Sequence, residues 1–201
     1  TDAGVHAVAM PANFETTRDI PLHGFVRGVN CNLADDVAVL SAVEEGADWD
    51  ARHAALAKTY RYQYLLGETR RPLIDRQSWW VARHHLDISA MQQGAQHLLG
   101  HHDFSAFRAS KCNSQTRRRC MYRIDVTQAG DVVTMRVTGN AFLRNMVRIM
   151  AGTLYRVGTG QTGIDEVSEI LASCDRTRAG MTAPARGLTL EEVHFEGYPR
   201  I

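Results

Sequence analysis

The 201-residue chain has few cysteines and few lysines, and it lacks a long apolar run. Its four cysteines contain no CxxC pair, which excludes a disulfide scaffold and indicates free thiols. No stretch approaches the roughly 18 uninterrupted apolar residues of a membrane span, so we expect no membrane partner. With 44% hydrophobic and 22% charged residues, the composition is that of a chain that folds around an apolar core.

The small net charge of +1 conceals an asymmetry along the chain. Residues 104–164 contain ten basic and two acidic side chains, whereas acidic side chains exceed basic ones elsewhere. Only two of the 23 basic residues are lysine, and arginine binds phosphate in a bidentate manner that lysine cannot copy. The basic stretch therefore favours a nucleic-acid partner, with a solvated charged face as the alternative.

Hydrophobic periodicity predicts a mixture of strands and helices without strict alternation. This pattern favours an α+β fold, with a largely antiparallel mixed sheet flanked by helices. Predicted strands cover residues 5–14, 37–43, 60–66, 78–82, 122–127, 132–138 and 188–195. Predicted helices cover residues 22–29, 88–99, 141–156 and 166–172, with Asp87 and Asp165 as N-caps of the second and fourth.

Gly158, Gly160 and Gly163 form a GxGxxG pattern, which is typical of dinucleotide-binding sites. Such a site needs a strand before the glycines and an acidic residue about 20 positions after them. Here a predicted helix precedes the glycines, and the later position is occupied by Ala183. We therefore expect a turn between two helices at this point.

Several histidines between His84 and His102 resemble a set of zinc ligands in type. His97 and His101 have the i, i+4 spacing that a helix would bring together, but Gly100 is predicted to end the helix between them. We therefore expect surface or capping histidines and no metal.

Thr1 allows a different chemistry, because an N-terminal threonine can attack a substrate with its own α-amine as the base. Lys58 and Lys111 are the chain's lysines, and neither is an obvious partner. GxSxG is absent, so an α/β-hydrolase lacks its nucleophile elbow. An N-terminal threonine hydrolase remains an alternative.

Asp2 stands at the head of the first predicted strand, followed by Ala3 and Gly4, which leave room for a bulky ligand. Tyr60 lies on another predicted strand, and Arg148 lies on the longest predicted helix. A carboxylate, a phenol and a guanidinium would form a metal-free site if the fold brings them together. Spacing along the chain does not decide whether it does.

Five segments resemble, in order, motifs of the tRNA pseudouridine synthase A (TruA) family. Thr-Asp-Ala-Gly-Val-His-Ala at the start resembles its catalytic motif, and residues 50–62 resemble its AR…A…Y-x-Y strand. Residues 100–108 resemble its G-x-HDFSSFR segment, residues 140–148 its active-site helix, and residues 183–190 its closing strand. The resemblance spans essentially the whole chain, and it implies a pseudouridine-synthase-like α+β fold.

The resemblance implies an isomerase that converts uridine to pseudouridine at positions 38 to 40 of the tRNA anticodon stem-loop. It implies no metal and no organic cofactor, and a homodimer whose two subunits both touch one tRNA. Asp2 falls on the family's catalytic aspartate, Tyr60 on the tyrosine against the target base, and Arg148 on the basic residue that pairs with the aspartate. We expect Arg144, one helical turn before Arg148, to add positive potential. Arg117, Arg118 and Arg119 are expected to contact the RNA backbone.

Family members carry a further N-terminal segment, with Gly-Arg before the Thr-Asp that opens this chain. We therefore expect a C-terminal portion of a longer protein with impaired activity, and an RNA-binding fragment without turnover is an alternative. Residues 1–84 are predicted to complete an N-terminal lobe and residues 85–201 to form a C-terminal lobe. A tRNA substrate implies a cytoplasmic location.

Overall fold

The computed structural model describes residues 1–82, 85–110, 112 and 114–200. The chain divides into two compact units, Thr1–Met10 with Ala55–Ile201, and Pro11–Ala54. The predicted lobe boundary at residues 84 and 85 involves His84, which lies outside the described residues, and that division stays a prediction. One sheet of the larger unit includes strands from both sides of this boundary.

The larger unit is built on a seven-stranded mixed sheet in the order β1-β7-β2-β6-β5-β4, with β3 paired to β2 off this path. Pairs β1–β7 and β2–β3 are parallel, and the other four pairs are antiparallel. The predicted α+β class is therefore confirmed. The strands are β1 His6–Ala7, β2 Ala57–Leu66, β3 Trp79–Val81, β4 Gly100–Asp103, β5 Arg118–Ala129, β6 Val132–Gly139 and β7 Leu188–His194.

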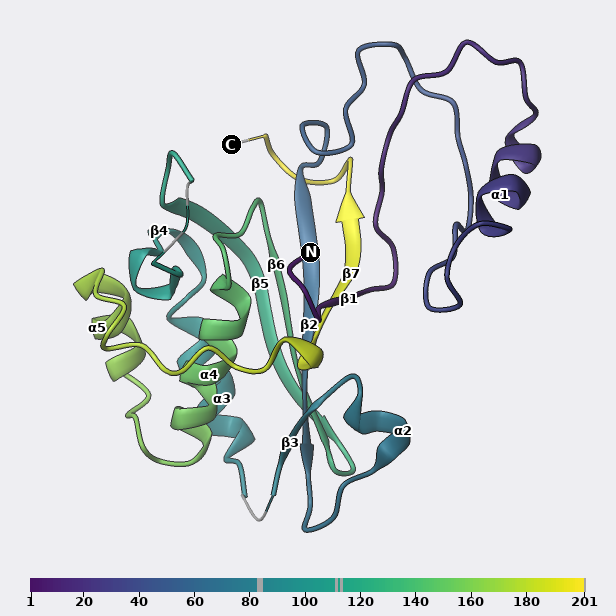
Figure 1. Ribbon diagram of the computed structural model, residues 1–201. Helices are drawn as coiled ribbons and strands as arrows, with labels where there is room; N and C mark the ends of the chain where they lie inside the picture. The colour runs from purple at the N-terminus through teal and green to yellow at the C-terminus, as the bar shows by residue number, and fades with distance from the viewer. Residues whose placement is uncertain (83–84, 111, 113, 201) are drawn as a thin grey trace. The chain divides into compact units, whose positions relative to one another are not determined.

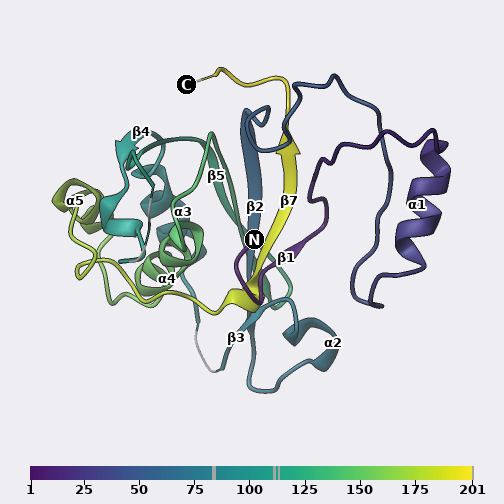
Figure 2. The ribbon, with the colours of Figure 1, turned by 45° about the horizontal axis from the view of Figure 1, so that its top comes forward.

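Three helices of this unit gather on one face of the sheet: α3 (Ile88–Gln96), α4 (Met146–Gly158) and α5 (Glu166–Ser173), as Figures 1 and 2 show. A short helix α2 (Pro72–Asp75) and two 3-10 turns, η1 (Ser105–Phe107) and η2 (Ala185–Gly187), complete the unit. Asp87 caps α3 as predicted, since its side chain accepts a hydrogen bond from the amide of Ala90. No helix within the described ranges has the length and apolar character that a membrane crossing needs.

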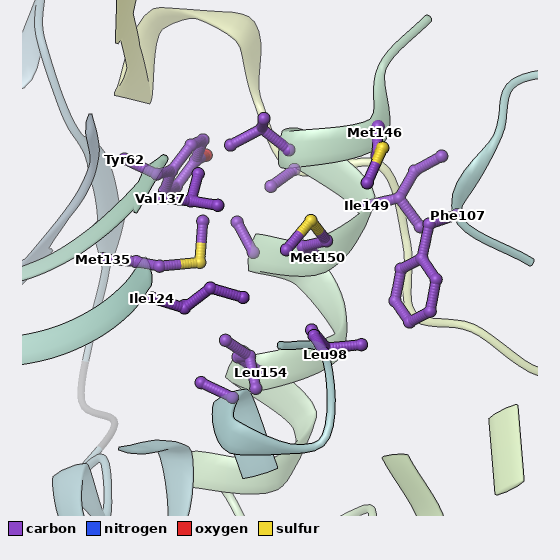
Figure 3. Close-up of a cluster of buried hydrophobic side chains, with 14 of the residues drawn as sticks. Tyr62, Leu98, Phe107, Ile124, Met135, Val137, Met146, Ile149, Met150 and Leu154 are labelled. Atoms are coloured by element: carbon purple, nitrogen blue, oxygen red, sulfur yellow. The ribbon is translucent and has the colours of Figure 1, made fainter. Parts of the chain in front are cut away.

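The core lies between the sheet and α4, where apolar side chains interlock (Figure 3). Tyr62, Met135 and Val137 project from the strands, and Met150 and Leu154 meet them from the helix. All five are fully buried. Each such side chain contributes roughly 1.5–3 kcal/mol by leaving water, so the position of α4 on the sheet is well determined.

The smaller unit, Pro11–Ala54, contains helix α1 (Leu22–Asn30) and corrects one prediction. Residues 37–43 are predicted from the sequence as a strand, but they form none. The side-chain amide of Asn30 instead binds both backbone groups of Val39, with Val39 N donating at 2.7 Å and Val39 O accepting at 2.9 Å. The alternating valines therefore belong to an exposed segment whose backbone is held by a side chain.

The predictions for the regions of β1, β4 and α4 also differ from the structure. The strand predicted over residues 5–14 is reduced to β1, and β4 was not predicted because its Gly-His-His-Asp sequence has no β-branched residue. The helix predicted from residue 141 begins at Met146, because Asn145 has left-handed backbone torsions with φ of 61°. Arg144 therefore precedes α4 and does not share a helix face with Arg148.

Candidate active site

Asp2 opens a tight turn that leads into β1. The amide of Val5 donates to the carbonyl of Asp2 at 3.1 Å, and Gly4 has φ of 79°, which is the geometry of a type II turn. A Cβ on Gly4 would lie 3.3 Å from the Cβ of Ala185, so the turn packs closely against η2. Asp2 is exposed.

Tyr60 lies in the middle of β2, paired with Leu190 of β7 on one side and Val137 of β6 on the other. Its half-buried ring meets the ring of Phe142 edge-on, with centroids 5.1 Å apart. Burial raises the pKa of the phenol, and the negative charge of Asp2 raises it further. The Asp2 carboxylate is therefore within electrostatic reach of Tyr60, and the phenol is neutral at physiological pH.

Arg148 is held on the first turns of α4 by three hydrogen bonds. Its Nε donates to the carbonyl of Ala183 at 2.7 Å, and its Nη1 donates to Oδ1 of Asn145 at 3.0 Å. The backbone carbonyl of Arg148 accepts from the amide of Ala183 at 3.1 Å. Within the described part of the chain, Nη2 has no hydrogen-bond partner and the guanidinium forms no salt bridge. A positively charged donor therefore remains available to a ligand.

Residues 183–187, which we call the connecting segment, contact both Arg148 and the turn of Asp2. Arg148 binds Ala183 at one end, and the turn of Asp2 packs on Ala185 two residues further along. Two residues of extended chain span about 7 Å. The views in Figures 1 and 2 place η2 beside the N-terminal segment, at the lower end of β7. The direct pairing of Asp2 with Arg148 stays a prediction.

The predicted RNA-contact arginines differ in exposure. Arg117 and Arg118 are exposed where β5 begins, and Arg144 is exposed just before α4. Arg119 is only 7% exposed, and its guanidinium donates to the carbonyls of Thr116 and Arg118 and to the hydroxyl of Ser114. Strand alternation explains the difference, because adjacent residues of a strand point to opposite faces. The predicted strand begins at residue 122, whereas β5 begins at Arg118. A prediction that started the strand at Arg118 would have placed the Arg119 side chain on the buried face.

The glycine pattern and the histidines have structural roles. Gly158 is the last residue of α4, and residues 159–163 lie between α4 and α5, so the predicted turn between helices is confirmed; Gly160 there has φ of 72°. The helix predicted to reach residue 99 ends at Gln96, with His97 as its C-cap, so it stops before Gly100; His101 lies on β4, and Gly100 has φ of 93°. Across the described ranges, no three His, Cys, Asp or Glu side chains converge on a point where a metal ion would bind. His84 lies outside those ranges.

Two features of the site were not predicted from the sequence. Asn145 holds the guanidinium of Arg148, and the connecting segment links that guanidinium to the turn of Asp2. The available signal in the sequence was the presence of Pro184 and Gly187 three residues apart, beside two alanines. Glycine and other small residues allow close backbone contacts.

The half of the chain that contains Arg148 and the connecting segment matches a family model. Residues 95–196 match the model described as tRNA pseudouridine synthase, a class of isomerase. The tRNA pseudouridine synthase A of Geotalea daltonii is 44% identical over 195 residues, which cover 97% of this chain and 80% of that protein. The corresponding protein of Pelobacter propionicus is 46% identical over the same shares, and that of Myxococcus xanthus is 46% identical over 99% of this chain and 75% of its own length. The chain belongs to the tRNA pseudouridine synthase A family.

Proposed function

We propose that this protein isomerises uridine to pseudouridine at positions 38 to 40 in the anticodon stem-loop of tRNA, with Asp2, Tyr60 and Arg148 at the reacting nucleotide. The observation that carries the proposal is that the turn of Asp2 and the guanidinium of Arg148 both contact one connecting segment, while the charge of Asp2 reaches Tyr60 of β2. The family to which the chain belongs supports the reaction and the tRNA substrate.

The reaction moves one bond and consumes nothing. The bond between C1′ and N1 breaks, the uracil turns over, C5 bonds to C1′, and the proton lost from C5 is balanced by one gained at N1. The Asp2 carboxylate either attacks C1′ or takes a proton from the sugar, and an ionised side chain suits both routes. Its exposure on a turn, beside the small residues Ala3 and Gly4, leaves space for the nucleotide.

Tyr60 acts through the face of its ring. Its raised pKa keeps the phenol protonated at neutral pH, so a resting phenolate base towards C5 is disfavoured. The ring is held edge-on by Phe142, which leaves a rigid aromatic face for the detached uracil to stack on. We propose that Tyr60 holds the base while it turns.

Arg148 orients the carboxylate through the Nη2 group that the described part of the protein leaves without a partner. Two of its three guanidinium nitrogens are occupied by Ala183 and Asn145, so the side chain is preorganised before substrate arrives. A positive charge near Asp2 favours the ionised carboxylate and the negative charge that develops in the reaction.

The RNA backbone is proposed to cross the exposed arginines Arg117, Arg118 and Arg144. Extracting a nucleotide from its stack costs a few kcal/mol, and phosphate contacts offset that cost. Arg119 supports the loop that precedes β5 from within, because its donors are directed to the protein itself. Backbone and shape recognition then selects the folded tRNA.

We further propose that two copies act on one tRNA, in the cytoplasm where tRNA is modified. Within Pro11–Ala54, all of which the structure describes, Ala51 alone is buried, and Phe14, Leu40 and Val43 are each at least 69% exposed. Apolar exposure of this extent supports an association that covers part of it. Sedimentation of the purified chain at several concentrations tests this, and a monomer at every concentration contradicts it.

Mapping of the modified position tests the proposal. The protein is incubated with three tRNA transcripts that carry uridine only at position 38, 39 or 40 of the anticodon arm, and with one that has cytidine at all three. Pseudouridine formation in the first three and none in the fourth is expected. Formation in the fourth transcript would place the target elsewhere, and binding without formation in any would favour an RNA-binding protein without turnover.

A further inference from the structure

The first four residues of the connecting segment, 183–186, each contact a different part of the larger unit. Ala183 is bound to Arg148 of α4 by two hydrogen bonds, as described above. Pro184 accepts a hydrogen bond at its carbonyl from the Oη of Tyr62 at 2.9 Å. Ala185 packs against the turn of Asp2, and the Nε of Arg186 donates to the carbonyl of Ser78 at 3.2 Å. The segment therefore couples α4, β2, the N-terminal turn and the residue before β3.

Tyr62 makes the central contact of this set. Its fully buried ring lies directly beneath Gly187, where a Cβ would lie 2.6 Å from the ring's Cζ and 2.9 Å from its Oη. The ring and hydroxyl of Tyr62 thus contact both Pro184 and Gly187. These two residues lie on either side of Ala185, which packs against the Asp2 turn. No other strand side chain in the described ranges donates a hydrogen bond to a backbone carbonyl of this segment.

We infer that Tyr62 is a positioning residue for the isomerisation: it holds the connecting segment so that the Asp2 turn and the Arg148 guanidinium keep a fixed separation across it. The inference rests on the function proposed above. Within the described residues, no hydrogen bond joins Tyr62 to Asp2 or Arg148, and it acts on Arg148 through Ala183 and on Asp2 through Ala185. Loss of its hydroxyl removes one anchor from the middle of the segment and leaves the contacts at both ends.

Burial raises the pKa of the Tyr62 phenol, against the smaller opposing effect of Arg148 and Arg186. The phenol therefore keeps its proton throughout the pH range of a tRNA-modifying reaction, and it donates to Pro184 throughout. A hydrogen bond that does not titrate is suited to a fixed positional role.

Tyr64 supplies a matched control on the same strand and the same face. It is fully buried, and its Oη donates to the carbonyl of Ala151 in α4 at 2.8 Å. Tyr62→Phe and Tyr64→Phe each delete one hydroxyl that binds one backbone carbonyl, so their structural costs are alike. Only Tyr62 reaches the connecting segment.

The experiment compares the wild-type chain with Tyr62→Phe and Tyr64→Phe in three measurements: kcat and KM on an anticodon-arm transcript, the urea midpoint of unfolding, and amide hydrogen exchange at Ala183 and Gly187. Both variants are expected to show similar shifts of the urea midpoint. Tyr62→Phe is expected to lower kcat about tenfold with KM within about twofold of the wild type. Its two segment amides are expected to exchange about tenfold faster, while Tyr64→Phe changes neither kcat nor these amides.

Equal kcat values in the two variants, or a loss confined to KM, would overturn the inference. If the wild-type chain forms no pseudouridine, the proposed function fails, and hydrogen exchange alone decides whether Tyr62 holds the segment. Exchange at Ala183 and Gly187 that is the same in both variants then overturns the positioning role, and faster exchange in Tyr62→Phe alone supports it.

Discussion

Tyr60 illustrates how the environment of a single side chain limits its chemistry. A tyrosine beside the target nucleotide can act as a stacking surface or as a base, and the structure separates these roles because burial and the charge of Asp2 both keep the phenol protonated. A ring that stacks needs its aromatic face, whereas a base needs its oxygen.

We predict that Tyr60→Phe retains turnover within about tenfold, whereas Tyr60→Leu loses roughly a hundredfold or more because the stacking face is removed. Rates of pseudouridine formation measured at saturating tRNA test this directly. Activity of the wild type should show no increase attributable to phenol ionisation below about pH 10. A Tyr60→Phe variant as inactive as Tyr60→Leu would show that the hydroxyl, and not the face, is required.

Residue identities were predictable from the sequence where a motif specified them, and orientations were not. Asp2, Tyr60 and Arg148 could be selected from the chain alone, but nothing in the spacing showed that the carbonyl of Ala183 would bind the guanidinium. Arg119 was grouped with its two neighbours, because a run of arginines contains no signal of which one turns inward. That depends on where β5 begins.

Helix α4 has a close backbone contact with residues 180–181. A Cβ on Gly152 would overlap the carbonyl of Met181, and a backbone atom cannot move aside as a flexible side chain can. Gly180 lies similarly close to the helix, since a Cβ there would lie 2.5 Å from the carbonyl carbon of Gly152. The absence of side chains at both positions allows residues 180–181, and so the connecting segment that follows, to approach α4.

We predict that Gly152→Ala lowers the free energy of unfolding by about 3 kcal/mol. Urea denaturation monitored by circular dichroism measures this. Gly163→Ala is the matched control, because a Cβ there lies 3.9 Å from its nearest neighbour, an ordinary contact, and stability should change by less than about 1 kcal/mol. Equal stability of the two variants would contradict the close packing of α4.

A bulge in β7 places Glu191 where two arginines reach it. The pairing register shifts between Thr59 and Tyr60, and Glu191 accepts from Nε of Arg136 at 2.6 Å and lies 3.2 Å from Nη1 of Arg61. The hydrogen bonds from Arg136 lower the pKa of Glu191, burial acts in the opposite direction, and the charges of both arginines lower it further.

The depressed pKa of Glu191 has a defined consequence for stability. The ionised carboxylate contributes its full stabilisation above the unfolded-state pKa of about 4.3, and this is lost as the pH falls through the lower folded-state pKa. We predict that Glu191→Gln flattens the acid limb of the stability curve below about pH 4.3. Glu169→Gln, in an exposed pair with Arg178, is the control and should leave the limb unchanged. An acid limb that Glu191→Gln does not alter would show that the cluster contributes nothing.

The elements that were predicted correctly are those in which the regularly spaced apolar residues all lie on the face that is buried. Strands β2, β5, β6 and β7 each pack against helices, so alternation and burial agree. The strand expected over residues 37–43 failed because alternation without a partner strand has no ladder to join. Strand β4 was missed because its pairing with β5 outweighs a weak intrinsic preference.

At the scale of the whole molecule, the exposure of each arginine decides whether the basic excess of residues 104–164 can contact RNA. Several of these arginines are directed into the protein or paired with acids, as Arg119 and Arg136 are. Exposed Arg117 and Arg118 remain near the start of β5, where Asp103 is the acidic group that they influence. Charge counts along the sequence therefore overestimate the number of groups that face a polyanion.

We predict that Arg117→Ala with Arg118→Ala weakens tRNA binding and reduces the slope of log K against log salt by about 1 to 2. Filter binding between about 50 and 200 mM salt measures the slope. Arg178→Ala, which removes an arginine paired with Glu169, serves as the control and should leave the slope unchanged. A slope that does not change in the double variant would place the RNA path elsewhere.

The central claim is that Asp2 performs chemistry on uridine at a site completed by Tyr60 and Arg148. Formation of pseudouridine replaces the hydrogen at C5, so tritium release from tRNA that carries [5-³H]uridine in its anticodon arm measures it directly. We expect release by the wild-type chain and none by Asp2→Asn, with tRNA binding by both. Release that persists in Asp2→Asn would contradict it.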